Sequence, residues 1–71
     1  MVKEIILILL LFNGEVSLPS FPFEGTVHEC FEYGDQLRFV LSTHRWVEED
    51  IMKSGWYLND GSGTWQGYYC N

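Results

Sequence analysis

The two cysteines constrain the fold of this chain more than any other feature of its sequence. Cys30 lies near the middle of the 71 residues and Cys70 is the penultimate residue, so a bond between them would close more than half of the chain into a loop. Such a closure stabilises the folded state by about 4 kcal/mol, because it lowers the entropy of the unfolded chain. A zinc site would need more ligands in clustered spacing, which His28 and His44 do not provide. We therefore predict a Cys30–Cys70 disulfide; the alternative is two reduced, buried thiols in a cytosolic protein.

The length of the chain allows one domain, residues 1–71, and makes its stability marginal. Composition compensates, since 46% of the residues are hydrophobic and 17% are aromatic. Each buried ring removes a large apolar area from water and orders few torsions. A small but well-filled core is therefore expected.

Net charge limits the classes of partner. Ten acidic residues against four basic ones give a formal charge of -6, and the bases are scattered along the chain: Lys3, Arg38, Arg45 and Lys53. A nucleic-acid binder needs clustered bases to displace counterions, so direct binding of DNA or RNA, or of an anionic membrane surface, is not expected. An acidic protein can instead bind a basic surface on a protein partner. The alternative is that the acids only keep a small hydrophobic protein soluble.

Residues 1–20 allow two interpretations. The apolar run Ile5–Phe12 after Lys3 is typical of a signal segment, but Glu4 offsets the charge and no clear cleavage site follows. The run equally predicts a buried β-strand that turns back at Asn13-Gly14 through a type I′ turn. Residues 15–18 would then form a returning strand, which Pro19 and Pro22 would end. A membrane is a partner only if the run acts as a signal or an anchor.

Residues 26–43 predict the main helix. Thr26 and Glu29 have the spacing of a capping box. Apolar and small residues recur at helical spacing on one face, which includes Cys30 and Gly34, while acidic residues lie largely on the other. Gly34 on the apolar face indicates a close approach of the helix to a sheet or a ring.

Residues 56–70 predict a C-terminal hairpin, with a loop at 59–63 rich in residues that tolerate positive φ. Strict alternation would place Cys70 and Tyr68 towards the helix, and Trp65 and Tyr69 on the opposite face. The segment between helix and hairpin, Ser42–Ser54, reads as a short helix or a loop. We predict an α+β fold, a small antiparallel sheet of ββαββ-like order with one amphipathic helix packed on it, tied to the last strand by the disulfide.

No catalytic, cofactor or metal motif stands out. Ser42, Thr43 and His44 are adjacent, which prevents triad geometry on a helix. His28 and Glu32 can pair across one helical turn, which is commonly a surface interaction. We therefore expect a protein that is not an enzyme and uses no cofactor or metal.

Acidic and aromatic side chains offer two candidate surfaces for a partner, one on the helix and one on the sheet. Trp is enriched at the centres of protein interfaces, so Trp46 beside acidic residues is a natural contact. The predicted surface consists of Glu29, Glu32, Asp35, Trp46, Glu48, Glu49, Trp65 and Tyr69. The ordinary alternative for each aromatic residue is packing against a small core.

Several short motifs resemble those of short uncharacterised proteins encoded by marine bacteriophages. The resemblance covers most of the chain and rests on Asn13-Gly14-Glu15, His28-Glu29-Cys30, Leu58-Asn59-Asp60-Gly61, Gly63-Thr64, Gln66-Gly67 and Cys70. It implies a viral accessory protein and no particular mechanism. We expect a small acidic interaction protein that binds a basic surface on a host protein. The alternative is a secreted, envelope or virion component that self-associates, and the disulfide favours an oxidising compartment or a virion over the cytoplasm.

Overall fold

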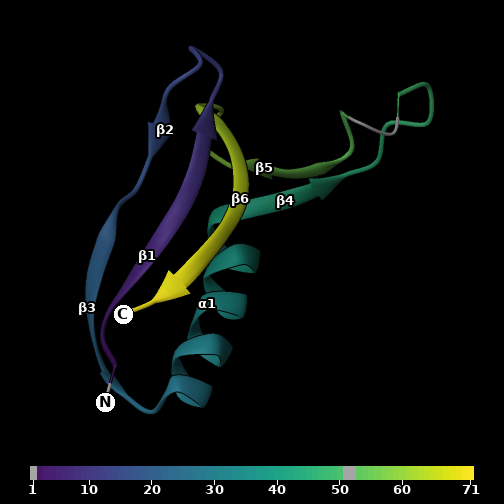
Figure 1. Cartoon of the computed structure of the whole chain (residues 1–71). Helices are drawn as coiled ribbons and strands as arrows, with labels where there is room; N and C mark the ends of the chain where they lie inside the picture. The colour runs from purple at the N-terminus through teal and green to yellow at the C-terminus, as the bar shows by residue number, and fades with distance from the viewer. Residues whose placement is uncertain (1, 51–52) are drawn as a thin grey trace.

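The computed structural model describes residues 2–50 and 53–71, which form one α-helix and a six-stranded antiparallel sheet (Figure 1). The strand order is β2-β1-β6-β5-β4, and β3 also pairs with β1. This confirms the α+β class, but the ββαββ pattern fits only loosely, because three strands precede the helix and three follow it. The elements are β1 Val2–Leu11, β2 Val16–Ser17, β3 Ser20–Gly25, α1 Val27–Leu41, β4 Ser42–Arg45, β5 Gly55–Leu58 and β6 Gly63–Cys70.

The turn after β1 differs from the predicted type I′ geometry. Gly14 has φ +90°, but no non-glycine residue among those described has a positive φ, so the type I′ prediction is wrong. The Leu11 carbonyl accepts a hydrogen bond from the Gly14 N–H at 3.0 Å, and the Leu11 N–H donates to the Glu15 carbonyl at 2.8 Å. These bonds make a three-residue loop that closes on a left-handed glycine. Asn13 acts through its side chain, which accepts from the Glu15 N–H at 2.9 Å.

The chain returns along β1 in two pieces. β2 pairs with the C-terminal half of β1 and β3 with its N-terminal half. Between them the Pro19 carbonyl accepts the Leu7 N–H at 2.9 Å, so pairing continues across the break. Pro22 does not end the strand as predicted; it lies inside β3, opposite Glu4. It is tolerated there because β3 lies at an edge of the described sheet, where a missing N–H costs no ladder bond.

A β-bulge interrupts the pairing of β1 with β6. Ile8 lies opposite Gly67 and Leu9 opposite Trp65, which leaves Gln66 as the extra residue. The bulge changes which side chains of β6 share a face, because strict alternation fails at that point. Trp65 is therefore buried in the core, at 7% exposure, and the prediction that it lies on the face of Tyr69 is wrong.

The helix begins as its capping box predicts. The Glu29 N–H donates to Thr26 Oγ1 at 3.1 Å, and the Thr26 N–H donates to Glu29 Oε1 at 3.0 Å. At the other end the helix stops at Leu41, two residues before the predicted end. Ser42 is the C-cap in an extended conformation, and the chain continues directly as β4.

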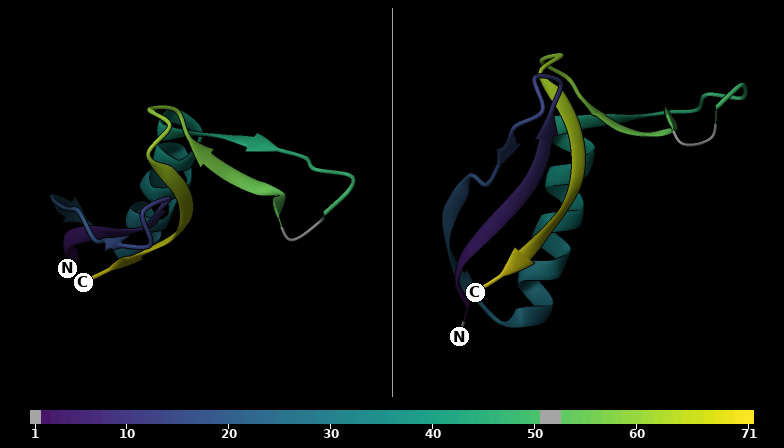
Figure 2. Two further views of the ribbon diagram at one scale, coloured as in Figure 1. Left: turned by 90° about the horizontal axis from the view of Figure 1, so that it is seen from above. Right: turned by 45° about the horizontal axis from the view of Figure 1, so that its top comes forward.

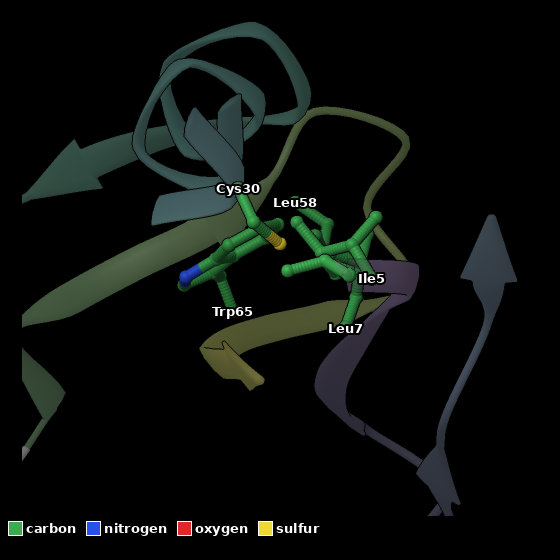
Figure 3. Close-up of a cluster of buried hydrophobic side chains, with 6 residues drawn as sticks. Ile5, Leu7, Cys30, Leu58 and Trp65 are labelled. Atoms are coloured by element: carbon green, nitrogen blue, oxygen red, sulfur yellow. The ribbon is translucent and has the colours of Figure 1, made fainter. Parts of the chain in front are cut away.

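The core lies between the helix and the inner face of β1 and β6, as Figure 3 shows. Ile5 and Leu7 from β1 and Cys30 from α1 are almost fully enclosed. Cys30 is bonded to Cys70 with 6.4 Å between their Cα atoms, which confirms the predicted disulfide. A disulfide is consistent with an oxidising compartment. Within the described residues, no helix has the length and apolarity needed to span a membrane.

The hairpin of β4 and β5 projects from the body formed by the helix and the other strands (Figures 1 and 2). We call residues 42–50 and 53–58 the arm. β5 is held to β6 by two residue pairs, Trp56 with Trp65 and Tyr57 with Thr64, so the rest of the hairpin extends beyond β6. The molecule is therefore elongated, with principal extents of 43 × 22 × 18 Å. The segment Ser42–Ser54, expected to be a helix or a loop, instead begins with a strand.

Candidate interaction surface

The structure distributes the eight predicted surface residues over three places. They lie on the helix (Glu29, Glu32, Asp35), on the arm (Trp46, Glu48, Glu49) and on β6 (Trp65, Tyr69). Trp65 is withdrawn into the core, whereas Tyr69 is 46% exposed. The predicted set is therefore not one surface, and each group has to be judged from its own contacts.

The helix acids already have partners within the chain. Glu29 closes the capping box, and hydrogen bonds from the backbone and side chain of Thr26 hold the pKa of Glu29 below its ordinary value. Glu32 lies 3.0 Å from His28, with both side chains exposed. Asp35 lies 3.2 Å from the Tyr68 hydroxyl, which donates to it. This face is thus largely used to stabilise the helix and to hold it on the sheet.

The Tyr68 hydroxyl links the helix to β6. It donates to the Phe31 carbonyl at 2.8 Å as well as to Asp35. Burial raises the pKa of Tyr68, and the neighbouring Asp35 carboxylate raises it further, because both disfavour a phenolate. The hydroxyl therefore stays protonated and keeps its donor role at neutral pH.

An aromatic row runs from the end of the helix along one face of the arm. His44 and Trp56 are directly opposite each other in the β4–β5 register, which brings their rings to 5.3 Å. Trp46 follows His44 at 5.9 Å, and Phe39 meets Trp56 edge-on at 5.1 Å. Trp46 and Phe39, the two ends of the row, are 66% and 64% exposed, whereas Trp56 between them packs against the core. We call these four residues the aromatic row.

A cation of the chain already occupies the inner end of the aromatic row. The Arg38 guanidinium lies 4.9 Å from the centre of the Trp56 ring and 5.2 Å from that of Phe39. Its Nε atom is buried and has no hydrogen-bond partner among the described residues, so stacking on the rings dominates the placement of this group. Arg38 thereby fastens the end of the helix to β5.

The base of the arm is fixed by hydrogen bonds that the sequence did not reveal. Asn59 Nδ2 donates to the Val40 carbonyl at 3.1 Å, and the Thr43 hydroxyl donates to Asn59 Oδ1 at 2.7 Å. The Asn59 N–H also donates to the Leu41 carbonyl at 2.9 Å. Asn59 thus satisfies carbonyls at the helix end while it holds β4. From the sequence, Asn59 predicts only a turn between two strands, because its partners Val40 and Thr43 lie far away in the sequence.

The hydroxyl and imidazole groups near the start of the arm point to separate partners. The buried Ser42 hydroxyl donates to the Arg38 carbonyl, and the Thr43 hydroxyl donates to Asn59. The His44 ring lies between Trp46 and Trp56. These contacts orient a surface; they do not align a nucleophile with a base. In residues 2–50 and 53–71, no three His, Cys, Asp or Glu side chains are grouped so that they could hold a metal ion.

The opposite face of the arm carries a separate contact. Arg45 lies 5.0 Å from the centre of the Tyr57 ring, which in turn lies 6.2 Å from that of Phe12. The Tyr57 hydroxyl donates to the Lys53 carbonyl. Arg45 therefore points away from the aromatic row, and its guanidinium contacts the Tyr57 ring instead.

Comparison with known proteins yields no relative: no family model, curated protein or solved structure matches the chain.

Proposed function

We propose that the protein is a non-enzymatic interaction protein whose arm binds a basic surface on a protein partner. The observation that carries this proposal is the aromatic row, which starts on the helix, continues along the arm and ends in the exposed Trp46. Aromatic side chains are enriched at interface centres, because each supplies a large contact area at low entropic cost. Of the four residues of the row, Trp56 packs against the edge of the core cluster, and the other three do not belong to it.

Charge supports a basic partner. Glu48 and Glu49 follow Trp46 on the arm and are exposed, in a chain with a formal charge of -6. Complementary charge steers a partner to such a patch and favours one orientation over others. The hydrogen bonds of Asn59 and Ser42 hold the base of the arm in place, which reduces the entropy lost on binding.

A phage accessory protein that binds a basic host protein is the concrete form of this proposal. The resemblance of its short motifs to those of marine bacteriophage proteins favours it, and so does the acidic charge. The disulfide favours a periplasmic, extracellular or virion setting for the folded protein.

Binding to a panel of purified basic proteins, measured at low and at physiological ionic strength, tests the proposal. We expect association that weakens as salt is added, since screening reduces the attraction between exposed charges. The double variant Glu48→Gln/Glu49→Gln should bind more weakly than wild type. The matched control Glu15→Gln/Glu24→Gln has the same net charge but changes exposed residues of the N-terminal hairpin, and it should retain more of the binding. Absence of any association at low ionic strength would refute the proposal.

Self-association is the second candidate function, and the outer face of the sheet favours it. Leu10, Val16 and Tyr69 are 42%, 61% and 46% exposed there. Exposed apolar side chains grouped on one face are a common site of contact between protein copies. Sedimentation over a wide concentration range distinguishes this candidate, because a chain that stays monomeric at high concentration cannot be a self-associating structural component.

A further inference from the structure

We infer that the outer end of the aromatic row binds an arginine side chain of the partner, with the guanidinium stacked on Trp46 and its charge facing Glu48 and Glu49. This inference rests on the proposed function and names the chemical group that the arm selects. It places the contact at one ring, so that it can be tested separately from binding in general.

The inner end of the row shows how these rings accept such a group. Arg38 stacks at 4.9 Å on Trp56 and at 5.2 Å on Phe39, and its Nε atom has no hydrogen-bond partner among the described residues. The chain thus contains one guanidinium held mainly by aromatic faces. Trp46 extends the same row through His44 and is 66% exposed. Indole is the side chain that attracts cations most strongly.

Among the described residues, no cationic side chain occupies the outer position. Arg45, the nearest one in sequence, lies over Tyr57 on the other face of the arm. In the part of the chain that the structure describes, the cation–ring contacts involve Phe39, Trp56 and Tyr57, not Trp46. Glu48 and Glu49, both exposed, lie two and three residues after Trp46 in the sequence. The position therefore combines an open ring face with negative charge, which a cation from a partner complements.

Arginine fits this position better than lysine. A guanidinium is planar, so it can stack on indole while its edge donates to carboxylates, and it is less strongly hydrated than an ammonium group. Lysine would gain the charge attraction but less of the stacking. The inference thus predicts a preference between two ligands of equal charge.

The test uses the oxidised full chain and three synthetic peptides of equal length, in which four arginines, four lysines or four citrullines are spaced by Gly and Ser. We expect the arginine peptide to bind about three- to five-fold more tightly than the lysine peptide, and the uncharged citrulline peptide to bind weakest. Trp46→Ala should reduce arginine binding and bring it level with lysine. Trp46→Phe should keep part of the preference, and the matched control Phe12→Ala, an exposed ring outside the row, should keep all of it.

A spectroscopic measurement locates the contact independently of affinity. Each of the three tryptophans gives one indole N–H signal, and the Trp46 signal is identified by its loss in Trp46→Phe. Titration with the arginine peptide should shift the Trp46 signal most. Equal affinity for arginine and lysine peptides in wild type, or an unchanged preference in Trp46→Ala, would overturn the inference while leaving the proposed function in place. Failure of every cationic peptide and basic protein to bind would refute both.

Discussion

At the scale of single residues, Gly34 decides how closely the helix approaches the sheet. The Tyr68 ring lies directly on the Gly34 backbone, and a Cβ atom added there would overlap that ring. Tyr68 has little freedom to move away, because its hydroxyl donates to both Phe31 and Asp35 on the same helix. Glycine lowers the stability of a helix, but at this position only glycine allows the ring to lie against the helix backbone.

Replacing Gly34 by Ala should destabilise the fold by about 1–3 kcal/mol, because overpacking against Tyr68 outweighs the better helix propensity of alanine. The free energy of unfolding in urea measures the effect. Gly67→Ala is the matched control: nothing lies within 4 Å of the Cβ atom that it would add, and it should leave stability nearly unchanged or slightly raised. A Gly34→Ala protein as stable as wild type would contradict the close packing described for this pair.

At the scale of elements, Asn59 joins the end of the helix to the arm. Asn59→Ala removes the hydrogen bonds to the Val40 carbonyl and from the Thr43 hydroxyl, but it keeps the backbone bond to Leu41. We expect a loss of about 1–2 kcal/mol and faster amide exchange in β4. Asn59→Asp keeps the acceptor for Thr43 but turns a carboxylate oxygen towards the Val40 carbonyl at the helix C-terminus, so near neutral pH it should cost at least as much as Asn59→Ala. Exchange in β4 that is unaffected by either change would show that other contacts hold the arm.

The helix start gives a prediction for pH. Hydrogen bonds from Thr26 hold the pKa of Glu29 below its ordinary value of 4.5, so the folded state favours the carboxylate. The resulting stabilisation is present above that ordinary value and is lost as the pH falls through the lowered one. In Glu29→Gln the free energy of unfolding should therefore be lower than in wild type near neutral pH, and the two should converge in acid. Thr26→Ala also removes the acceptor of the Glu29 N–H, which does not titrate, so its loss of stability should narrow in acid without vanishing. A constant difference between Glu29→Gln and wild type across this range would exclude the carboxylate as its source.

The sequence predicts some elements correctly and others not. It succeeds where the interacting residues are close in the sequence and fails where they are far apart. The capping box is complete within four residues, so Thr26 and Glu29 predict the helix start correctly. The bulge at Gln66 depends on how β6 meets β1, and alternation along one strand cannot reveal it. Strict alternation contains no bulge, and for that reason it places Trp65 on the wrong face of β6. β4 reads Ser-Thr-His-Arg, without apolar alternation, and is a strand because β5 pairs with it. The sequence alone predicts Trp46 as a contact residue. It does not predict the aromatic row, because the row depends on the β4–β5 register that brings His44 opposite Trp56.

At the scale of the whole molecule, stability and the proposed binding surface lie in different parts. Most of the enclosed residues and the disulfide belong to the helix, β1 and β6, and the arm adds only its base, with Leu58; the outer end of the aromatic row, His44 and Trp46, lies away from this core. Substitutions at Trp46 can therefore change binding with little effect on folding. Both cysteines lie in the body, so loss of the disulfide should lower the stability of the whole body.

Removal of the disulfide gives the last prediction. Cys30 is fully enclosed and Cys70 ends β6, so the double variant Cys30→Ala/Cys70→Ala removes the bond without placing a polar group in the core. We expect the free energy of unfolding to fall by about 4 kcal/mol, a large share of the total for a chain of this size. Guanidinium denaturation of the oxidised and the reduced wild type and of the variant measures the loss. The reduced wild type should match the variant, and reductant should not affect the variant. Equal stability of the oxidised and reduced wild type would mean that β1–β6 pairing and the core suffice to hold the helix, and that the bond contributes little to the fold.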